Sequence, residues 1–333
     1  MLMRYRCLFA LLFVLNWGCR PTTENQHAQE TMSGKLTAVV EKTIVLDSIP
    51  SGSGLAKVDQ HLYIISDDSP YFFQLDLQYQ LQQKIGIKNG PKSKEYRIPK
   101  KIKPDYESLA TAQINGAPFL LAFGSGSLSP TRDSLLLINL ADLKNPQTYD
   151  LTHLYYLIKG AANLPEAELN MEGSAIIGED LFLFNRGQNV MIQTNWARLL
   201  LFLKGGPNIL EPEFKIHRIA LPQINGVNPG FSGACQLGQE NKILFTASVE
   251  NTKSWVEDGE ILGSFIGILD VEKLTSDPLE SAAILTDKNG RTVIEKVESI
   301  EFLKKESNGE IKALGLTDDD LGGSKILEIT IKR

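Results

Sequence analysis

The stretch EGSAIIGEDLFLFNRGQ (172–188) contains the pattern that decides the fold. A small or acidic residue leads into an apolar strand, a turn follows, and a second strand ends in polar residues. Four further copies begin at Ser53, Glu107, Ser232 and Glu298, so successive starts lie 54, 65, 60 and 66 residues apart. This period is too long for helical-pair or leucine-rich repeats. It favours small sheets repeated around an axis, as in a β-propeller.

Each copy continues with a third apolar segment and then a more polar stretch where an outer strand fits. The third segments are DSLLLINL (133–140), ARLLLFL (197–203) and SFIGILDV (264–271). Short strands rich in Ile, Leu, Val and Phe, separated by Gly, Asn and Asp turns, are typical of such sheets. The sequence therefore predicts an all-β fold, a single β-propeller with five visible blades.

The two ends of the domain are predicted to meet in one blade. The last copy ends after SKILEITIK (324–332), which leaves no chain for an outer strand. The segment AVVEKTIVLDSI (38–49) can supply that strand, which would close the ring and cover exposed strand edges. A sixth, degenerate blade within residues 141–168 or 272–295 is the alternative, and residues 156–173 could include a short helical excursion.

The N-terminal residues indicate export. Arg4 and Arg6 precede the apolar run CLFALLFVLNWG (7–18), which is too short to span a membrane and is typical of a signal peptide. Cys19 follows, so residues 1–18 resemble a bacterial lipoprotein signal in which Cys19 becomes acylated. A polar tether (20–35) then leads to a propeller domain at 36–333. We expect a lipid-anchored protein of the bacterial cell envelope, at the outer membrane facing the periplasm; a plain secretory signal is the alternative.

The cysteine count and the net charge limit which disulfides and which binding partners are expected. Loss of Cys7 with the signal and acylation of Cys19 leave Cys235, predicted to be a small buried hydrophobe, so no intramolecular disulfide is expected. Removing Arg4 and Arg6 from a chain of net charge −6 leaves −8. Nucleic acid is not an expected partner for so acidic a chain, and we expect a monomer.

Acidic residues are predicted to converge on one mouth of the propeller channel. In an antiparallel hairpin the start of the first strand and the end of the second lie at the same rim. Like charges brought together favour a hard cation with oxygen ligands, and calcium is the natural candidate. The candidate calcium ligands are Asp67, Asp68, Glu107, Glu172, Glu298, Asp318, Asp319 and Asp320, with Asn185 and Glu250 on the same face. Alternatively, the Glu and Ser residues at the copy starts hydrogen-bond neighbouring backbone, and the TDDD stretch (317–320) is a solvated turn.

Basic residues reach the same rim. Residues 84–103 contain eight Lys or Arg residues and one Glu, and they lead into the strand near Glu107. Such a cluster could hold a phosphate or another small anionic ligand. Arg132 and Arg186, on polar loops after second strands, are further candidates for anion binding. The alternative is a solvated, mobile loop.

Several of these motifs resemble bacterial phytase-like propellers, the exported proteins described as having esterase-like activity of phytase. The resemblance rests on SGLAKVDQHLYIISDD, DYESLA with GSGS and a following Arg, NMEGSAIIGEDLFLFNRG, and VESIEF with GLTDDD, and it covers roughly residues 50 to 330. It implies calcium ions that bind phosphate and activate water, with Lys and Arg holding the substrate. The matching acids here are Glu172, Glu298, Asp318, Asp319 and Asp320, whereas Ser53 and Ser232 replace acids.

Other catalytic classes find little support. The segment GFSGA (230–234) has Ala234 where a nucleophile elbow needs a second Gly, and a structural role is expected for Ser232. The four histidines lack metal-ligand spacing, and no phosphate loop is present. Two functions remain. The first is a lipid-anchored propeller that binds a ligand or protein partner at an acidic mouth, with calcium as a cofactor. The alternative is a calcium-dependent phosphoric-ester hydrolase.

Overall fold

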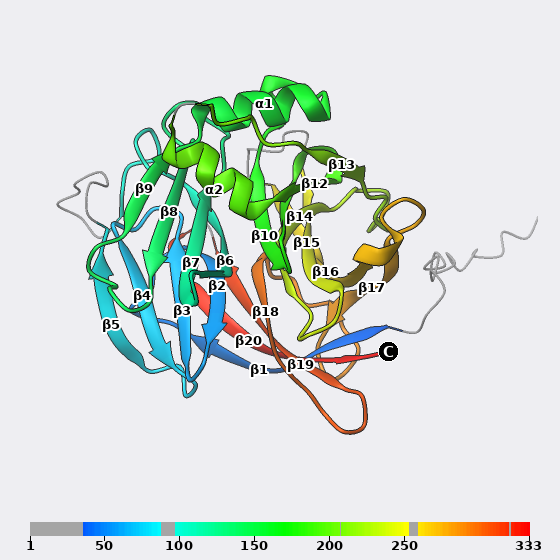
Figure 1. Cartoon of the computed structure of the whole chain (residues 1–333). Helices are drawn as coiled ribbons and strands as arrows, with labels where there is room; N and C mark the ends of the chain where they lie inside the picture. The colour runs from blue at the N-terminus through cyan, green and yellow to red at the C-terminus, as the bar shows by residue number, and fades with distance from the viewer. Residues whose placement is uncertain (1–35, 88–96, 207, 253–258, 320) are drawn as a thin grey trace, which may run out of the picture. The chain divides into compact units, whose positions relative to one another are not determined.

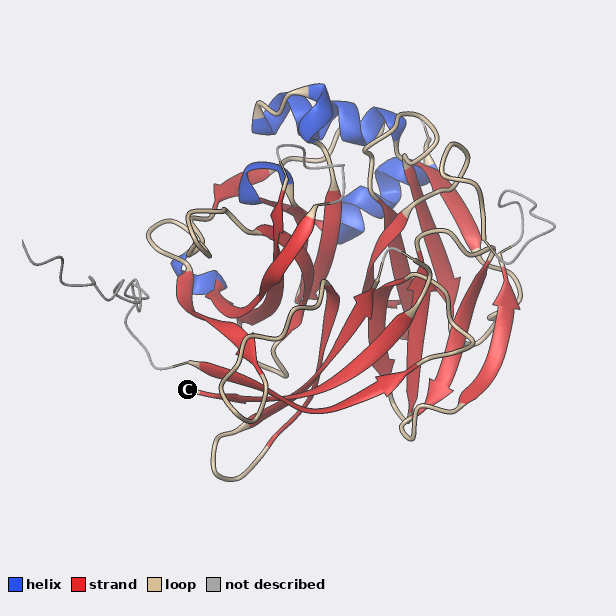
Figure 2. Ribbon diagram, turned by 180° about the vertical axis from the view of Figure 1, so that it is seen from behind, coloured by secondary structure: helices blue, strands red, loops and turns tan. Residues whose placement is uncertain are grey.

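The computed structural model describes residues 36–87, 97–206, 208–252, 259–319 and 321–333. The predicted signal, Cys19 and tether lie outside these residues. Strands dominate the described chain and form twisted sheets, with two α-helices and short 3₁₀ turns in addition (Figures 1 and 2). Within these residues, no helix is long and apolar enough to cross a membrane.

Three sheets have four strands each, and each follows the chain order with antiparallel pairing. The first contains β2 (Gly52–Val58), β3 (His61–Ser66), β4 (Tyr71–Asp76) and β5 (Leu81–Gly86). The second contains β6 (Tyr106–Ile114), β7 (Ala117–Gly124), β8 (Ser134–Asn139) and β9 (Gln147–Asp150). The third contains β10 (Met171–Ile177), β11 (Asp180–Asn185), β12 (Val190–Asn195) and β13 (Lys215–Arg218).

The remaining strands form one eight-stranded sheet built from two groups of four. The first group contains β14 (Gly230–Gln236), β15 (Lys242–Asn251), β16 (Glu260–Asp270) and β17 (Leu279–Thr286). The second contains β18 (Val297–Lys305), β19 (Ile311–Asp318), β20 (Ser324–Lys332) and β1 (Thr37–Val45). Strand β1 pairs antiparallel with β20 and parallel with β17. The prediction that the N-terminal segment supplies the outer strand of the last group is confirmed.

The first strand of every group contacts the first strands of its neighbours. Contacts run from β2 to β6, β10, β14 and β18, and β18 in turn contacts β2. This cyclic order is propeller-like. Residues 141–168 contribute β9, helix α1 (Thr152–Ala162) and a short 3₁₀ turn η1 (Glu166–Glu168). Within the described chain, that region and residues 272–295 form no separate four-stranded sheet.

All five first strands carry a β-bulge near their start. In each, the pairing with the second strand skips one residue, and the skipped residues are Ser53, Glu107, Glu172, Ser232 and Glu298. These are the repeat positions found in the sequence. A bulge kinks its strand and re-aims the extra side chain. The sequence repeat is therefore a repeat of backbone geometry.

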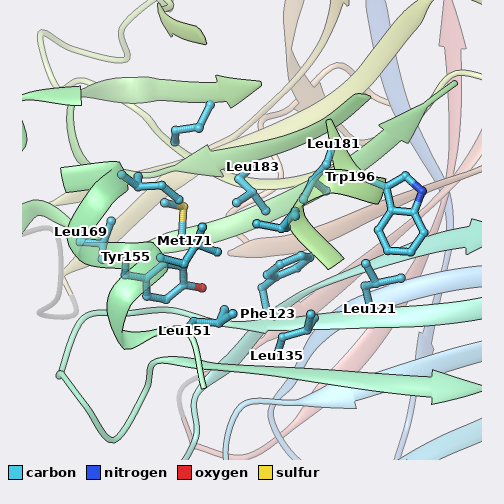
Figure 3. Packing of buried hydrophobic residues seen from close by; sticks show 14 of the residues in the cluster. Leu121, Phe123, Leu135, Leu151, Tyr155, Leu169, Met171, Leu181, Leu183 and Trp196 are labelled. Atoms are coloured by element: carbon cyan, nitrogen blue, oxygen red, sulfur yellow. The ribbon is translucent and has the colours of Figure 1, made fainter. Parts of the chain in front are cut away.

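One predicted strand is wrong. Residues 197–203 lie in helix α2 (Trp196–Lys204), and the third strand of that sheet is β12. The side chain of Asn195 accepts a hydrogen bond from the backbone N–H of Arg198, which caps the helix. Trp196, Leu199 and Leu200 recur at helical spacing and are buried. They pack with the core that α1 shares with the second and third sheets (Figure 3).

The serines at the repeat positions connect neighbouring sheets. Ser53 Oγ donates to the Tyr106 carbonyl at 2.5 Å, and Ser232 Oγ donates to the Val297 carbonyl at 2.6 Å. Ser232 is fully buried on its bulge. The structure therefore supports the structural role expected for Ser232.

Replacing Ser232 with alanine is expected to lower the free energy of unfolding by about 1–2 kcal/mol, because a buried hydrogen bond between sheets is lost. Thermal and urea unfolding would measure the change. Ser276→Ala is the matched control, since its hydroxyl donates to the Lys273 carbonyl in an exposed turn. Equal effects of the two substitutions would contradict the role of Ser232.

Candidate functional site

The repeated bulges surround one charged cavity of about 480 Å³. Four of the five bulged residues line it, all except Ser232. The residues that line the cavity are Ser53, Asp67, Asp68, Arg97, Ile98, Pro99, Lys100, Lys103, Asp105, Glu107, Ser127, Arg132, Asn170, Glu172, Arg186, Glu250, Lys296, Glu298 and Asp318. Most of them come from strand starts and ends at the same rim, as the hairpin geometry predicts.

On one side of the cavity lies the Asp67 cluster, defined here as Asp67, Asp105, Glu107, Lys103 and Arg132. The Lys103 ammonium contacts Asp67 and also Asp105 Oδ1, the latter at 2.6 Å. Arg132 Nη1 lies 2.7 Å from Asp105 Oδ2. One carboxylate oxygen from each of the three acids lies within 4.8 Å of the other two, a spacing that could hold a metal ion. Within the described part of the chain, Glu107 has no hydrogen-bonding partner.

The pKa of each carboxyl group in this cluster depends on how many cations contact it. Burial raises the pKa of Glu107 well above its usual range, and the charges of Asp105 and Asp67 add to the effect. Burial also raises the pKa of Asp67, although Lys103 opposes this. Burial acts on Asp105 in the same direction, but Lys103 and Arg132 outweigh it and lower its pKa. The cluster thus has one well-compensated carboxylate and two that favour a proton or another cation.

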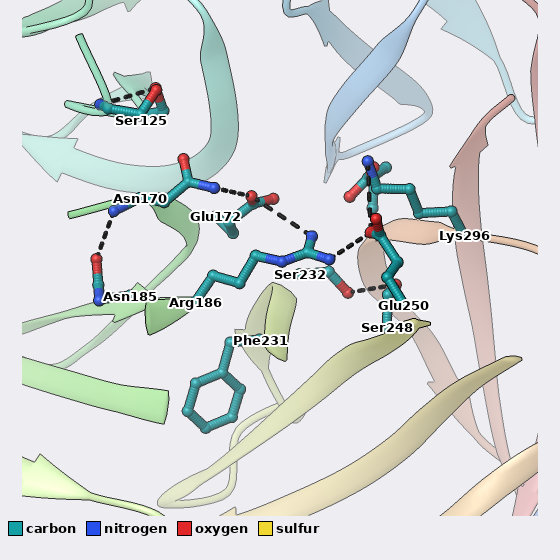
Figure 4. A network of polar contacts seen from close by, with 12 residues as sticks. Ser125, Asn170, Glu172, Asn185, Arg186, Phe231, Ser232, Ser248, Glu250 and Lys296 are labelled. Carbon is teal, nitrogen blue, oxygen red and sulfur yellow. Dashed lines mark hydrogen bonds and ion pairs between the residues drawn. The ribbon is translucent and has the colours of Figure 1, made fainter. Parts of the chain in front are cut away.

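A second group of lining residues is the Glu172 cluster, defined here as Glu172, Glu250, Glu298, Arg186 and Lys296, of which Figure 4 labels all but Glu298. The Arg186 guanidinium lies between Glu250, which it contacts directly, and Glu172, 3.6 Å away. Lys296 Nζ lies 2.9 Å from Glu298 and 3.7 Å from Glu250. These side chains are deeply buried, with Arg186 only 7% exposed.

Electrostatics also divide the carboxylates of the Glu172 cluster. Burial raises the pKa of Glu172, with Arg186 opposing, and it raises the pKa of Glu298, with Lys296 opposing. Burial acts on Glu250 too, but Arg186 and Lys296 together lower the pKa of that carboxyl. Asn170 Nδ2 donates to Glu172 Oε1 at 2.6 Å, which fixes the carboxyl orientation. One carboxylate again carries most of the cation pairing.

The two clusters have the same composition. Each contains three carboxylates and two cations among the described residues, so each has a formal charge of −1 with all groups ionised. Each also has one buried oxygen without a hydrogen-bond partner in the part of the chain that is described, Asp67 Oδ1 in one and Glu298 Oε2 in the other. A buried unpaired carboxylate oxygen is costly, so both clusters favour an added cation or proton.

The other predicted site residues divide into two groups. Asp68 lines the cavity and pairs with Arg97 at 2.6 Å, and Asp318 lines it too. Asp319 is exposed and accepts hydrogen bonds from two amides of its own turn, those of Leu321 and Gly323, so it does not line the cavity. Asp320 lies outside the described residues.

Asn185 is also on the predicted face but plays a local part. Its side chain accepts from the Asn170 backbone N–H at 2.7 Å and donates to the carbonyls of Glu168 and Gly187. It does not line the cavity. Asn185 thus orders the entry into β10.

The predicted anion-binding residues are paired with acids. Arg132 contacts Asp105 and Arg186 contacts Glu172 and Glu250, so both guanidinium groups already have anionic partners. Part of the basic segment, residues 88–96, lies outside the described residues. Of its described cations, Arg97, Lys100 and Lys103 line the cavity.

The sequence interpretation missed Asp105, Asn170 and Lys296 as site residues, and it included Lys103 only as part of the basic segment 84–103. Asp105, Asn170 and Lys296 each lie two residues before a bulged glutamate. The signal that could have found them is this spacing, a polar residue preceding each acidic repeat start by two positions. Lys103, two residues earlier still, has no counterpart in the other copies.

Glu301 is a further acid with a shifted pKa, half-buried on β18 and outside the two clusters. Burial raises its pKa to about 8, although Lys57 opposes the shift, and Glu301 in turn helps to raise the pKa of the buried thiol of Cys235. The raised pKa means that between about pH 4.5 and 8 the folded chain binds a proton that the unfolded chain has lost. The stability contributed by this protonated carboxyl is full below that window and declines as pH rises through it.

Glu301→Gln is expected to reduce the fall in melting temperature between pH 5 and pH 8, because it removes this one titration. Thermal unfolding at several pH values would measure the difference from the unsubstituted chain. Glu213→Gln, an exposed acid, is the control and should leave the pH profile unchanged. A profile unchanged by Glu301→Gln would show that this carboxyl does not titrate in the window.

Comparison with known proteins identifies a family of unknown function. A comparison of the sequence with curated proteins found no match. Solved structures with a similar arrangement include the glutaminyl cyclase of Myxococcus xanthus (11% identity, TM-score 0.47, 89% of this chain and 96% of that one). They also include the PQQ-bound aldose sugar dehydrogenase of Streptomyces coelicolor (13%, 0.48, 90% and 99%) and a calcium-binding regucalcin of Agrobacterium tumefaciens (13%, 0.38, 84% and 77%). These TM-scores are below 0.5, so the likenesses carry no inference about ligand or activity.

A family model described as a family of unknown function (DUF6929) matches residues 48–331. Its description names no phytase, so the resemblance to phytase-like propellers stays a prediction. The match covers nearly the whole described chain, including all strands of the cavity. The chain therefore belongs to the DUF6929 family.

Proposed function

We propose that this protein is a five-bladed propeller, closed into a ring by β1, that binds a small cationic ligand in its charged cavity. One observation carries the proposal. Two buried clusters on one cavity each have three carboxylates and two cations, and each holds an oxygen without a partner among the described residues. A cationic ligand would compensate charges that the chain leaves uncompensated.

Calcium is the first specific candidate. Asp67, Asp105 and Glu107 offer three carboxylate oxygens within 4.8 Å of one another, and carboxylates are the ligands that calcium prefers. Of these residues, Glu107 is the one that no side-chain cation contacts within the described chain. Lys103 competes for the other two, since its ammonium contacts both Asp67 and Asp105.

The hydrolase alternative is less well supported. A phosphoric-ester substrate needs cationic groups free to hold its phosphate. Arg132 and Arg186 are both committed to carboxylates, and the cavity lining contains eight acids and six bases. An anionic substrate would thus enter a field of its own sign. The arrangement favours binding of a cation over phosphate-ester hydrolysis.

The proposal includes a lipid anchor on Cys19 and a place in the bacterial cell envelope. It rests on the signal pattern of residues 1–18 and the polar stretch that follows Cys19. Cell fractionation of the unsubstituted chain and of Cys19→Ala would test it. The unsubstituted chain should be in the membrane fraction and Cys19→Ala should not; equal fractionation would contradict the anchor.

Calcium titration by calorimetry on the full chain tests the binding function, with thermal unfolding followed in calcium and in chelator. We expect saturable heat and a higher melting temperature in calcium. Glu107→Gln should remove both effects, whereas the exposed control Glu213→Gln should keep them. Absence of heat and of any shift in the unsubstituted chain would overturn calcium binding.

A further inference from the structure

The chemistry of the two clusters specifies the cation further. We infer that the cavity binds an organic dication, a small molecule with an ammonium group at each end, one for the Asp67 cluster and one for the Glu172 cluster. The inference rests on the proposed function and narrows its ligand class. Its basis is that each cluster, with all groups ionised, has a formal charge of −1 and that both line the same cavity. A third buried oxygen without a partner among the described residues, Asp68 Oδ1, belongs to a carboxylate whose charge Arg97 already pairs.

The unpartnered oxygens show what kind of group each place lacks. Asp67 Oδ1 and Glu298 Oε2 are buried, and neither accepts a hydrogen bond from any described residue. The Glu298 side chain is only 6% exposed, so water has little access to it. An ammonium group supplies one positive charge and three N–H donors, and a carboxylate oxygen accepts such a donor strongly. One ammonium would therefore meet both the charge and the hydrogen-bonding deficit of a cluster.

A single metal ion satisfies the pair of clusters less well. Calcium takes six to eight oxygens, whereas the described triad supplies one close oxygen from each of three residues. Bound there, a calcium ion would place two charges at a cluster that lacks one. The Glu172 cluster would keep its formal charge of −1. Two single charges joined in one molecule match the distribution that the residues present.

The rest of the lining is compatible with a short linker. Ile98 and Pro99 are the apolar residues among those that line the cavity, and Ile98 is buried. A methylene chain could pack against them while both ends remain paired with carboxylates. A volume of about 480 Å³ also lies within the range of small-molecule sites.

A length series of straight-chain diamines tests the inference. Calorimetry on the full chain would compare diaminoalkanes of two to six carbons with monoamines of equal carbon number. We expect one preferred diamine length, bound at least tenfold more tightly than its monoamine. Monoamines that bind as well as diamines at every length would overturn the inference, because a single cluster would then account for all binding.

Two substitutions test whether each cluster binds one end of the diamine. Asp67→Asn and Glu298→Gln each remove the excess negative charge of one cluster. Each should therefore lower the affinity for the preferred diamine to that for the monoamine. Glu213→Gln removes an exposed negative charge and should leave the diamine advantage intact. Retention of the advantage in both cluster variants, with folding confirmed by thermal unfolding, would also overturn the inference.

The outcomes separate this inference from the proposed function. Calcium binding without diamine binding would overturn the dication and support cation binding. Diamine binding without calcium binding would support the dication and exclude calcium as the ligand. Binding of neither would overturn both.

Discussion

Replacing Lys103 with methionine is expected to tighten calcium binding at least about tenfold and to make folding depend on calcium. The Lys103 ammonium lies between Asp67 and Asp105, where an added cation would have to bind. Breaking a buried ion pair by removing one partner typically costs about 3–5 kcal/mol. Without calcium the variant should therefore melt several degrees below the unsubstituted chain.

Calcium should restore most of that loss. At 100 times its dissociation constant a ligand stabilises the folded state by about 2.7 kcal/mol, which is close to the expected cost of the substitution. Calorimetry and thermal unfolding, in calcium and in chelator, would measure both effects. Lys101→Met is the matched control, because Lys101 is exposed and does not line the cavity. A Lys103→Met chain that melts identically with and without calcium would contradict competition at this position.

Replacing Arg186 with methionine should give a loss of stability as large as that expected for Lys103→Met, about 3–5 kcal/mol. Arg186 is the cation between Glu172 and Glu250, and its removal leaves the Glu172 cluster with three buried carboxylates and Lys296 alone. Methionine keeps much of the apolar stem, so the loss reports mainly the missing charge. Thermal and denaturant unfolding would measure it.

Two comparisons isolate the charge of Arg186. Arg198→Met, on the exposed face of α2, removes the same group and should change stability by less than about 0.5 kcal/mol. Gly230→Ala keeps the charge but displaces the side chain, because a Cβ at this glycine would lie 2.4 Å from Arg186 Cγ. It should destabilise the fold by a smaller amount. A stable Arg186→Met chain would show that the acids are neutral without it.

Much of the fold could be predicted because the repeat positions coincide with a backbone feature. The starts at Ser53, Glu107, Glu172, Ser232 and Glu298 are the bulged residues of the five first strands, so the spacing of the sequence copies reflects the spacing of the sheets. The pairing of β1 with β20 was also predicted, and the structure confirms it. The helical structure of segment 197–203 could not be predicted, because a short apolar run is compatible with a buried strand and with a helix equally.

The acids of the candidate site were predicted from the sequence, whereas the cations that pair with each acid were not. Glu107, Glu172 and Glu298 share one rim because the hairpin geometry brings strand starts together, and this follows from sequence. The pairing of particular cations with these acids does not follow from sequence, because Lys103 and Lys296 lie in connections whose course depends on tertiary packing. Basic residues were expected at this rim as binders of an anionic ligand; in the structure Lys103, Arg132 and Arg186 instead pair with the cavity's own carboxylates.

The pairing of β1 with β20 has a consequence for biosynthesis. Thr37 pairs with Lys332, so β1, the first described strand to be synthesised, waits for a partner at the other end of the described chain. At about 5–20 residues per second this interval is roughly 15–60 s. For most of it β1 has neither of its partners, since β17 and β20 are both synthesised late, and unpaired strand edges recruit other chains. The yield of folded protein should therefore depend on what shields a single early strand until β17 and β20 have been made.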